Sequence, residues 1–131
     1  MQVKFTIPGP AVAKQRPRLG RNGSVYTPNK TKNYEKLCKL SYGNNYYFKE
    51  EFIEINILFK FEVPKSYTKK RRSEALSGLL RPTKADIDNF IKSCLDGLNK
   101  VAFEDDRKVV KIAAEKIYSD VSETIIEIKS L

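Results

Sequence analysis

An otherwise basic chain gathers carboxylates in one short window, residues 85–106. The acids of this window are Asp86, Asp88, Asp96, Glu104, Asp105 and Asp106. In an extended segment, side chains two residues apart point to the same side, roughly 6 to 7 Å apart, so Asp86 and Asp88 could share a cation. If the strand after Asp106 packs beside them, three or four carboxylates meet. With no histidine beside them, such carboxylates favour Mg²⁺ or Mn²⁺, which would organise an attacking water and offset charge on a phosphodiester.

A lysine lies in the same window. Lys92 follows Asp88 by one helical turn and is predicted on the same polar face. One interpretation is an ion pair between residues i and i+4, which contributes roughly 0.2–0.5 kcal/mol. The other is a cation beside the metal that stabilises the transition state. The residues alone leave both interpretations open.

The composition excludes several kinds of chemistry. The chain has no histidine, which removes Ser-His and Cys-His nucleophiles and nearly every His-ligated metal site. The six glycines are scattered and form no phosphate-binding loop. Cys38 and Cys94 each lie in an apolar pattern and are predicted to be reduced, packed thiols. Catalysis would therefore depend on carboxylates, lysines or tyrosines.

Two basic segments flank the acidic window. The first 34 residues contain seven bases and no acid, and residues 60–84 contain eight bases and two acids, within a net charge of +9. Such segments commonly neutralise nucleic-acid phosphates, the alternative being a merely solvated surface. A protein that only holds DNA gains nothing from carboxylates between them, because these repel phosphates. The charge pattern thus favours a nucleic-acid partner.

Hydrophobic periodicity predicts the elements that position these residues. Alternation predicts strands over residues 2–7, 52–63 and about 110–118, with a last strand carrying Ile126 and Ile128. Helices are predicted over residues 32–42, capped by Thr31, and over 88–100, capped by Asp88. The core stripe of the second helix is Ile91, Cys94, Leu95 and Leu98. Residues 69–76 suggest a short helix, residues 11–29 a long loop or irregular hairpin, and residues 109–117 also fit a helix.

These elements predict an α+β fold: a small single domain with about four mostly antiparallel strands and two helices packed on one face. A length of 131 residues, 40% of them hydrophobic, suits one domain spanning residues 1–131. No apolar run approaches the roughly 20 residues of a membrane span, and no secretory segment is apparent. We therefore expect no membrane association and a cytoplasmic location.

Several short motifs resemble one nuclease family. D-I-D-N at residues 86–89, followed by Lys92, a helix and D-D-x-x-V at residues 105–109, is similar to the signature of RusA-type Holliday junction resolvases, including the phage and prophage branch. K-Q-R-P-R at 14–18, Y-T-P at 26–28 and R-P-T-K at 81–84 are similar to segments of that branch. The resemblance covers nearly the whole chain, and residues 81–110 carry its specific part. The amino-terminal basic loop departs from that of the best-known cellular member.

The resemblance implies a dimeric, Mg²⁺-dependent endonuclease, for which Mn²⁺ would substitute, acting in a bacterial or phage-infected cell. Asp86, Asp88 and Asp106 fall on the family's catalytic carboxylates and Lys92 on its essential lysine. Asp105 matches the neighbouring acid, and we expect it among the metal ligands with the other three. The DNA-contacting residues expected on this basis and from the basic loop are Lys14, Arg16, Arg18, Arg81 and Lys84.

Together these features predict a metal-dependent, structure-specific endodeoxyribonuclease that nicks four-way junctions or other branched double-stranded DNA in recombination and repair. One alternative is a less selective flap or fork nuclease with the same chemistry. The other is a non-catalytic basic DNA-binding module whose acidic window makes only surface salt bridges.

A homodimer is expected because resolving a four-way junction takes two cuts related by an approximate twofold axis. The second face of the predicted strand at residues 52–63 is a candidate interface, together with aromatic residues taken as exposed. These are Phe52, Tyr42, Tyr46, Tyr47 and Phe48. The alternative is that these aromatic residues cover the domain's own core.

Overall fold

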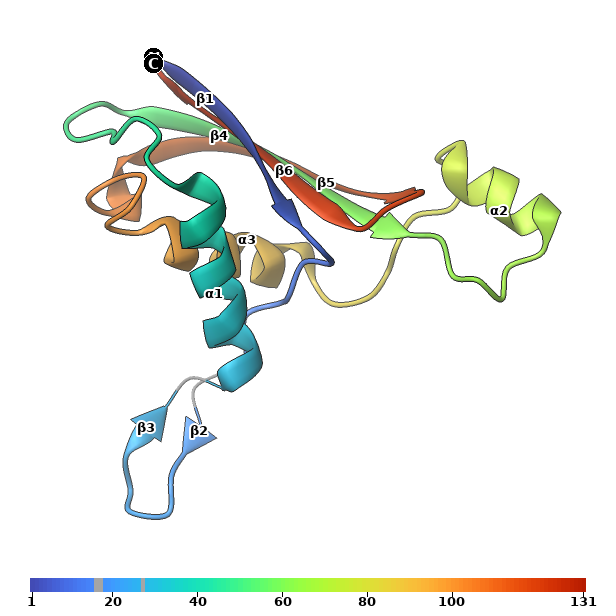
Figure 1. The fold of residues 1–131 in the computed structure, drawn as a ribbon, viewed down its shortest axis with the longest axis horizontal. Helices are drawn as coiled ribbons and strands as arrows, with labels where there is room; N and C mark the ends of the chain where they lie inside the picture. The colour runs from blue at the N-terminus through green and yellow to red at the C-terminus, as the bar shows by residue number, and fades with distance from the viewer. Residues whose placement is uncertain (16–17, 27) are drawn as a thin grey trace.

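The computed structural model describes residues 1–15, 18–26 and 28–131. Within these ranges, a four-stranded mixed sheet has the strand order β1-β6-β4-β5 (Figure 1). The strands are β1 (Gln2–Pro8), β4 (Ile53–Glu62), β5 (Val109–Ser119) and β6 (Glu123–Ser130). β6 pairs antiparallel with both β1 and β4, whereas β4 and β5 are parallel.

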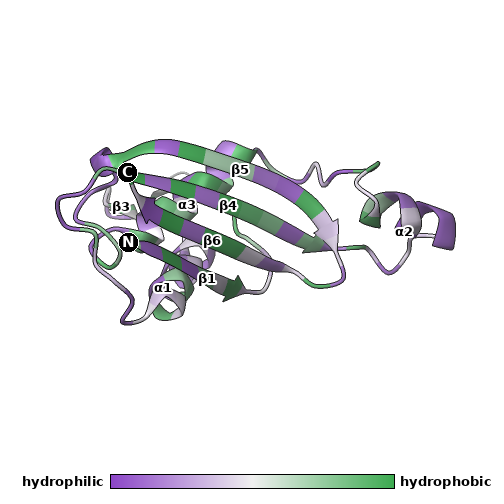
Figure 2. Cartoon of the chain, turned by 90° about the horizontal axis from the view of Figure 1, so that it is seen from above, coloured by the Kyte–Doolittle hydropathy of each residue, from purple (hydrophilic) through white to green (hydrophobic). Residues whose placement is uncertain are grey.

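The register of the sheet places apolar side chains in rows on one face. Phe5 pairs with Ile126, Ile126 with Ile57, and Ile57 with Ala114, so one row crosses all four strands. Figure 2 shows hydrophobic and hydrophilic residues alternating along the strands, as expected where one face is buried. Burying a large aliphatic or aromatic side chain contributes about 1.5–3 kcal/mol, so this face is the main source of stability.

Two helices cover that face of the sheet (Figure 1). They are α1 (Asn29–Tyr42) and α3 (Ile87–Leu98), which also pack against each other. At the place where they meet, a Cβ added to Gly97 would lie 2.7 Å from Cys38 Cβ, so the close approach requires glycine there. Cys38 and Cys94 are free and fully buried, which confirms the predicted packed thiols.

Both predicted helix caps are wrong. α1 begins earlier than predicted, with Pro28 at the N-cap position. Thr31 therefore lies inside the first turn, buried, where its hydroxyl accepts a hydrogen bond from the Gln15 N–H at 3.3 Å. α3 begins at Ile87 with Asp86 at the N-cap position, so Asp88 falls in the first turn. A carboxylate there is favoured by the helix dipole rather than by a capping bond.

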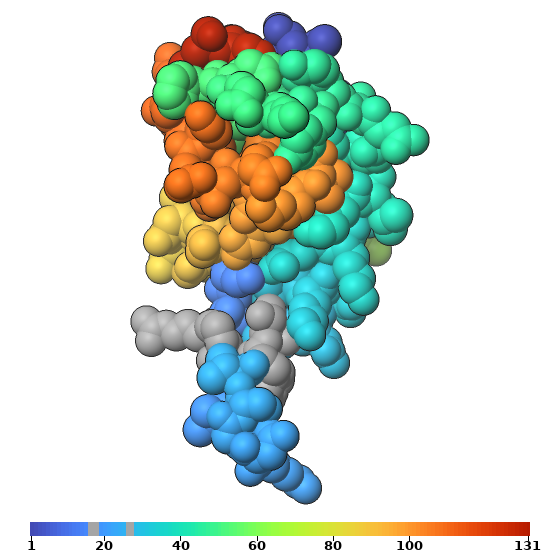
Figure 3. All heavy atoms as spheres, turned by 90° about the vertical axis from the view of Figure 1, so that its left-hand side faces the viewer, coloured from blue at the N-terminus to red at the C-terminus, as the bar shows by residue number. Residues whose placement is uncertain are grey.

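Two smaller elements project from the body. β2 (Arg18–Leu19) and β3 (Val25–Tyr26) form an antiparallel hairpin that stands away from the helices (Figures 1 and 3), which confirms the predicted irregular hairpin. α2 (Lys69–Leu76) lies beyond the end of the sheet. It is formed by the same residues for which the sequence suggests a short helix.

The predicted α+β class, with two helices on one face, is confirmed. Residues 109–117 form a strand rather than a helix. Two of the aromatic residues expected at the surface belong to the core: Tyr42 is 1% exposed and Phe48 is 0% exposed. Tyr42 packs edge-on against Phe5 of β1, and the Phe48 N–H donates to the Ala102 carbonyl at 2.8 Å. Tyr46 and Phe52 are exposed as predicted. In the ranges that the structure describes, no helix is long and apolar enough to cross a membrane.

Candidate active site

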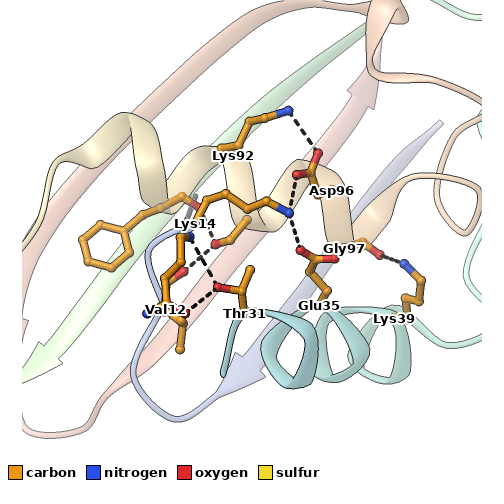
Figure 4. Close-up of polar contacts among 11 residues, drawn as sticks. Val12, Lys14, Thr31, Glu35, Lys39, Lys92, Asp96 and Gly97 are labelled. Carbon is orange, nitrogen blue, oxygen red and sulfur yellow. Dashed lines mark hydrogen bonds and ion pairs between the residues drawn. The ribbon is translucent and has the colours of Figure 1, made fainter. Parts of the chain in front are cut away.

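The polar face of α3 carries the lysine singled out by the sequence. The ammonium of Lys92 lies 3.3 Å from the carboxylate of Asp96, one turn further along the helix (Figure 4). The sequence suggested Asp88 as the partner of Lys92, and the structure instead pairs Lys92 with Asp96. The Lys92 side chain is 57% exposed and that of Asp96 only 19%, so Asp96 is the fixed member of the pair.

Asp105 and Asp106 lie where the chain turns into β5. The Asp105 carboxylate accepts a hydrogen bond from the Arg107 N–H at 2.9 Å, at the start of the short 3₁₀ helix η1 (Asp106–Lys108). This bond lowers the pKa of Asp105 from its ordinary value. Burial raises the pKa of Asp106, and the hydrogen bond and charge of Asp105 add to that rise. Of the two neighbours, Asp105 therefore keeps its charge more readily and Asp106 holds a proton more readily.

Asp106 also responds to the charges on α3. Lys92 lowers its pKa and Asp96 raises it, both through space. The ionisation of Asp106 is therefore sensitive to the charges of the Lys92–Asp96 pair. The predicted return of Asp105 and Asp106 to the position of Asp86 and Asp88 stays a prediction.

Asp86 and Asp88 lie at the amino-terminal end of α3, and both are exposed. Among the described residues, no three acidic or cysteine side chains are close enough together to hold one metal ion. Convergence of all the predicted ligands is therefore not seen in this structure. Their assignment as metal ligands stays a prediction.

The loop that leads into Asp86 is fastened to β5. The Arg81 guanidinium donates to the Glu115 carboxylate at 2.7 Å and to the Lys116 carbonyl at 3.2 Å. The Lys116 ammonium donates to the Ala85 carbonyl at 3.0 Å. Ala85 has a φ of 60°, a left-handed conformation that costs a non-glycine residue about 1–2 kcal/mol. β5 therefore sets the direction in which the chain enters α3, a role for Lys116 that no sequence motif indicates.

Lys14 joins three parts of the site (Figure 4). Its ammonium lies 2.8 Å from Glu35 on α1 and 3.0 Å from Asp96 on α3. Burial lowers the pKa of Lys14, but the hydrogen bonds to Glu35 and Asp96 outweigh this and raise it above the ordinary value. The Lys14 N–H also donates to the Asn89 carbonyl at 2.8 Å. Lys14 is thus a structural link, and sequence reasoning missed the roles of Glu35 and Asp96.

The other predicted DNA-binding residues are variously placed. Arg16 lies outside the described residues. Arg18 begins β2, and its side chain also lies outside the described part. Lys84 is exposed beside Asp86, while Arg81 is engaged with Glu115. The proposed binding of DNA by Lys14 stays a prediction, because its ammonium is occupied by two carboxylates here.

The donor set fits a magnesium ion in its chemistry. Carboxylate oxygens are the ligands that Mg²⁺ and Mn²⁺ prefer. The charge of Asp105 raises the pKa of Asp106, and a divalent cation would offset the repulsion between the two ionised carboxylates. Asp105 and Asp106 thus offer the type of oxygen ligand that such an ion prefers.

Comparison with known proteins identifies relatives of this chain. The family model described as Endodeoxyribonuclease RusA matches residues 8–129. The Bacillus subtilis (strain 168) protein described as "Uncharacterized protein YqaN" is 36% identical over 129 residues, covering 90% of this chain and 89% of its own length. Both matches extend over nearly the whole fold, including α3 and β5.

Proposed function

Because the chain belongs to the RusA endodeoxyribonuclease family, we propose that it nicks branched DNA, with four-way junctions as its preferred substrate. The observation that carries this proposal is the family match, which spans the acidic window with Lys92 and most of the basic segments on either side of it. Acidic and basic side chains in one place suit phosphodiester hydrolysis, because the acids bind a metal and the bases bind the phosphates.

We propose that Asp86, Asp88, Asp105 and Asp106 hold Mg²⁺. The ion would activate water and offset negative charge on the phosphate. Lys92 would add positive charge at the reacting phosphate, and its exposed ammonium leaves it able to reach the substrate. Asp96 would keep Lys92 on this side of the helix, and Lys14 would neutralise Asp96 so that Lys92 is only weakly retained.

A panel of substrates tests the proposal. Matched four-way, three-way, flap and linear DNAs are digested with Mg²⁺, and the products are examined for paired, symmetric nicks. Preferential, symmetric cleavage of the four-way junction supports the resolvase function. Equal cutting of flaps and forks would indicate the less selective nuclease, and no cutting of any substrate by a protein that still binds them would indicate a DNA-binding module.

A homodimer is part of the same proposal. Two identical sites would make the two cuts of one junction, and a twofold interface needs only one self-complementary patch. The open face of the sheet is one candidate, because it has a shallow depression of about 670 Å³ lined in part by Leu58, Ala113 and Ile125. Light scattering of the protein, free and on a junction, measures the mass, and a stable mass of one chain in both cases would remove the dimer.

A further inference from the structure

α2 presents a dense positive charge outside the predicted site. Its first four residues, Lys69 to Arg72, are all basic, and its buried residue is Ala75. Over residues 65–84 the chain has seven bases and one acid, Glu74. Figure 2 shows α2 as a largely hydrophilic helix standing beyond the sheet. The helix therefore contributes little to the core and exposes most of its charge.

Specific interactions hold this helix in place. The Thr68 hydroxyl accepts a hydrogen bond from the Arg71 N–H at 3.2 Å and caps the helix. Arg72 forms a 2.8 Å ion pair with Asp120 in the β5–β6 turn. The Arg71 guanidinium lies 4.4 Å from the centre of the Tyr67 ring, which in turn packs edge-on against Tyr118 of β5. α2 is thus a fixed platform, anchored by its two arginines.

The lysines of the platform are available to bind another molecule. In the described part of the chain, Lys65, Lys69 and Lys70 have no carboxylate within 4.0 Å. The charges of Lys69 and Lys70, in the first turn of α2, also oppose the positive end of the helix dipole and so disfavour the helix itself. A partner with closely spaced negative charges would relieve both the mutual repulsion and the conflict with the dipole.

We infer that this platform, Lys65, Lys69 and Lys70 on and before α2, binds the phosphate backbone of a duplex arm of the substrate. The inference rests on the proposed function and adds a second DNA-binding surface to it. The chain runs from α2 through Arg81 and Lys84 directly into Asp86, so basic residues continue from the platform to the first predicted carboxylate (Figure 1). Interactions of this kind with phosphates fix the position of DNA without reading its sequence.

The test compares junctions with long and short arms. The double variant Lys69→Ala, Lys70→Ala keeps both anchoring arginines and replaces exposed residues by good helix formers. On junctions with arms of about two helical turns, we expect about tenfold weaker binding and a salt slope shallower by about two units. On junctions whose arms are too short to reach α2, we expect wild-type affinity. The nicking rate at saturating DNA should be unchanged.

Two further variants make the result specific. Lys69→Arg, Lys70→Arg keeps the charge and should bind as the wild type does. Lys36→Ala, Lys49→Ala removes the same charge from exposed positions elsewhere and should leave the dependence on arm length intact. An equal reduction of affinity on long and short arms, or an unchanged salt slope, would overturn the inference. If the wild type nicks no branched DNA but the dependence on arm length holds, the proposed nuclease function fails and the role of α2 in binding DNA stands.

Discussion

The ammonium of Lys14 lies 3.0 Å from the carboxylate of Asp96, across the seam between the amino-terminal segment and α3. Asp96 also holds Lys92, so two lysines from distant parts of the sequence share one carboxylate. Both side chains of the Lys14–Asp96 pair are 19% exposed, and this partial burial makes the pair stronger than an exposed one. The pair thus connects the start of the basic loop to the lysine proposed to act at the phosphate.

Replacing Lys14 by methionine should destabilise the fold and slow nicking. The change keeps the apolar stem but leaves Asp96 and Glu35 without their shared cation, and we expect unfolding free energy to fall by about 2 kcal/mol in urea titration. Asp96 should then retain Lys92 more strongly and lower the nicking rate. Lys36→Met, on the exposed face of α1, is the control and should change neither quantity. Wild-type stability and rate in the Lys14 variant would argue against the link.

Removing single carboxylates should abolish cleavage and spare binding. Asp86→Asn, Asp88→Asn and Asp106→Asn each remove a proposed metal ligand and also a charge that repels phosphate. Nicking assays should show no product, while gel-shift affinity for a four-way junction stays the same or rises. Glu104→Gln, an exposed acid of the same window outside the proposed set, should retain activity. A variant that cuts at nearly the wild-type rate would lose its place among the ligands.

Metal binding itself can be measured without cleavage. Isothermal titration with Mg²⁺ or Mn²⁺ should show a specific site in the wild type and a weakened one in the Asp106→Asn protein, because carboxylates are the preferred ligands of these ions. Chelation with EDTA should stop nicking, and added Mg²⁺ should restore it. An acidic window that makes only salt bridges would bind neither ion specifically.

The basic loop should contribute to affinity through charge. A double Arg16→Ala, Arg18→Ala variant should bind junctions more weakly, and the slope of log K against log salt should fall by about one unit for each phosphate that the loop no longer neutralises. Binding measured at several salt concentrations gives this slope directly. An unchanged slope would leave both arginines as ordinary solvated charge.

Stability should decline in alkali because of buried tyrosines. Burial raises the pKa of Tyr42 to about 12 and also raises that of Tyr34, against an unfolded value near 10. The contribution of these two protonated tyrosines to the free energy of unfolding is fully present below about pH 10. It falls as the pH rises toward 12, since only the unfolded chain releases their protons. The decline should be about 1.4 kcal/mol per pH unit for each tyrosine. Tyrosinate absorbance should show two slow tyrosines that ionise only on unfolding.

Much of the fold follows from local patterns. The alternation of Ile53, Ile55, Ile57 and Phe59 defined β4, because a strand buried on one face must alternate. In α3, Cys94 and Leu98 are buried as predicted, but Phe90 completes the core while Ile91 and Leu95 are only partly buried. The buried face of α3 is rotated relative to the predicted one because the packing of the helix on the sheet decides which face is covered. Hydrophobic periodicity does not give the rotation of a helix about its own axis.

The site was less predictable than the fold. The window of acids and Lys92 stood out in the sequence, and the family match supports the motif. The pairing of Lys14 with Asp96 and Glu35 left no signal, because it joins residues distant in the chain through tertiary packing alone. The predicted caps were also wrong: Pro28 and Asp86 take the N-cap positions, and the predicted residues fall inside the first turns.

The strand order has a consequence for synthesis. β6 is made after the other five strands, yet it lies between β1 and β4 and is hydrogen-bonded to both. Chains emerge from the ribosome amino terminus first. Until β6 emerges, the sheet of the nascent chain is therefore in two parts that are not hydrogen-bonded to each other. One part is the unpaired strand β1, and the other is the parallel β4–β5 pair. A complete sheet for α1 and α3 to cover exists only once β6 has been made.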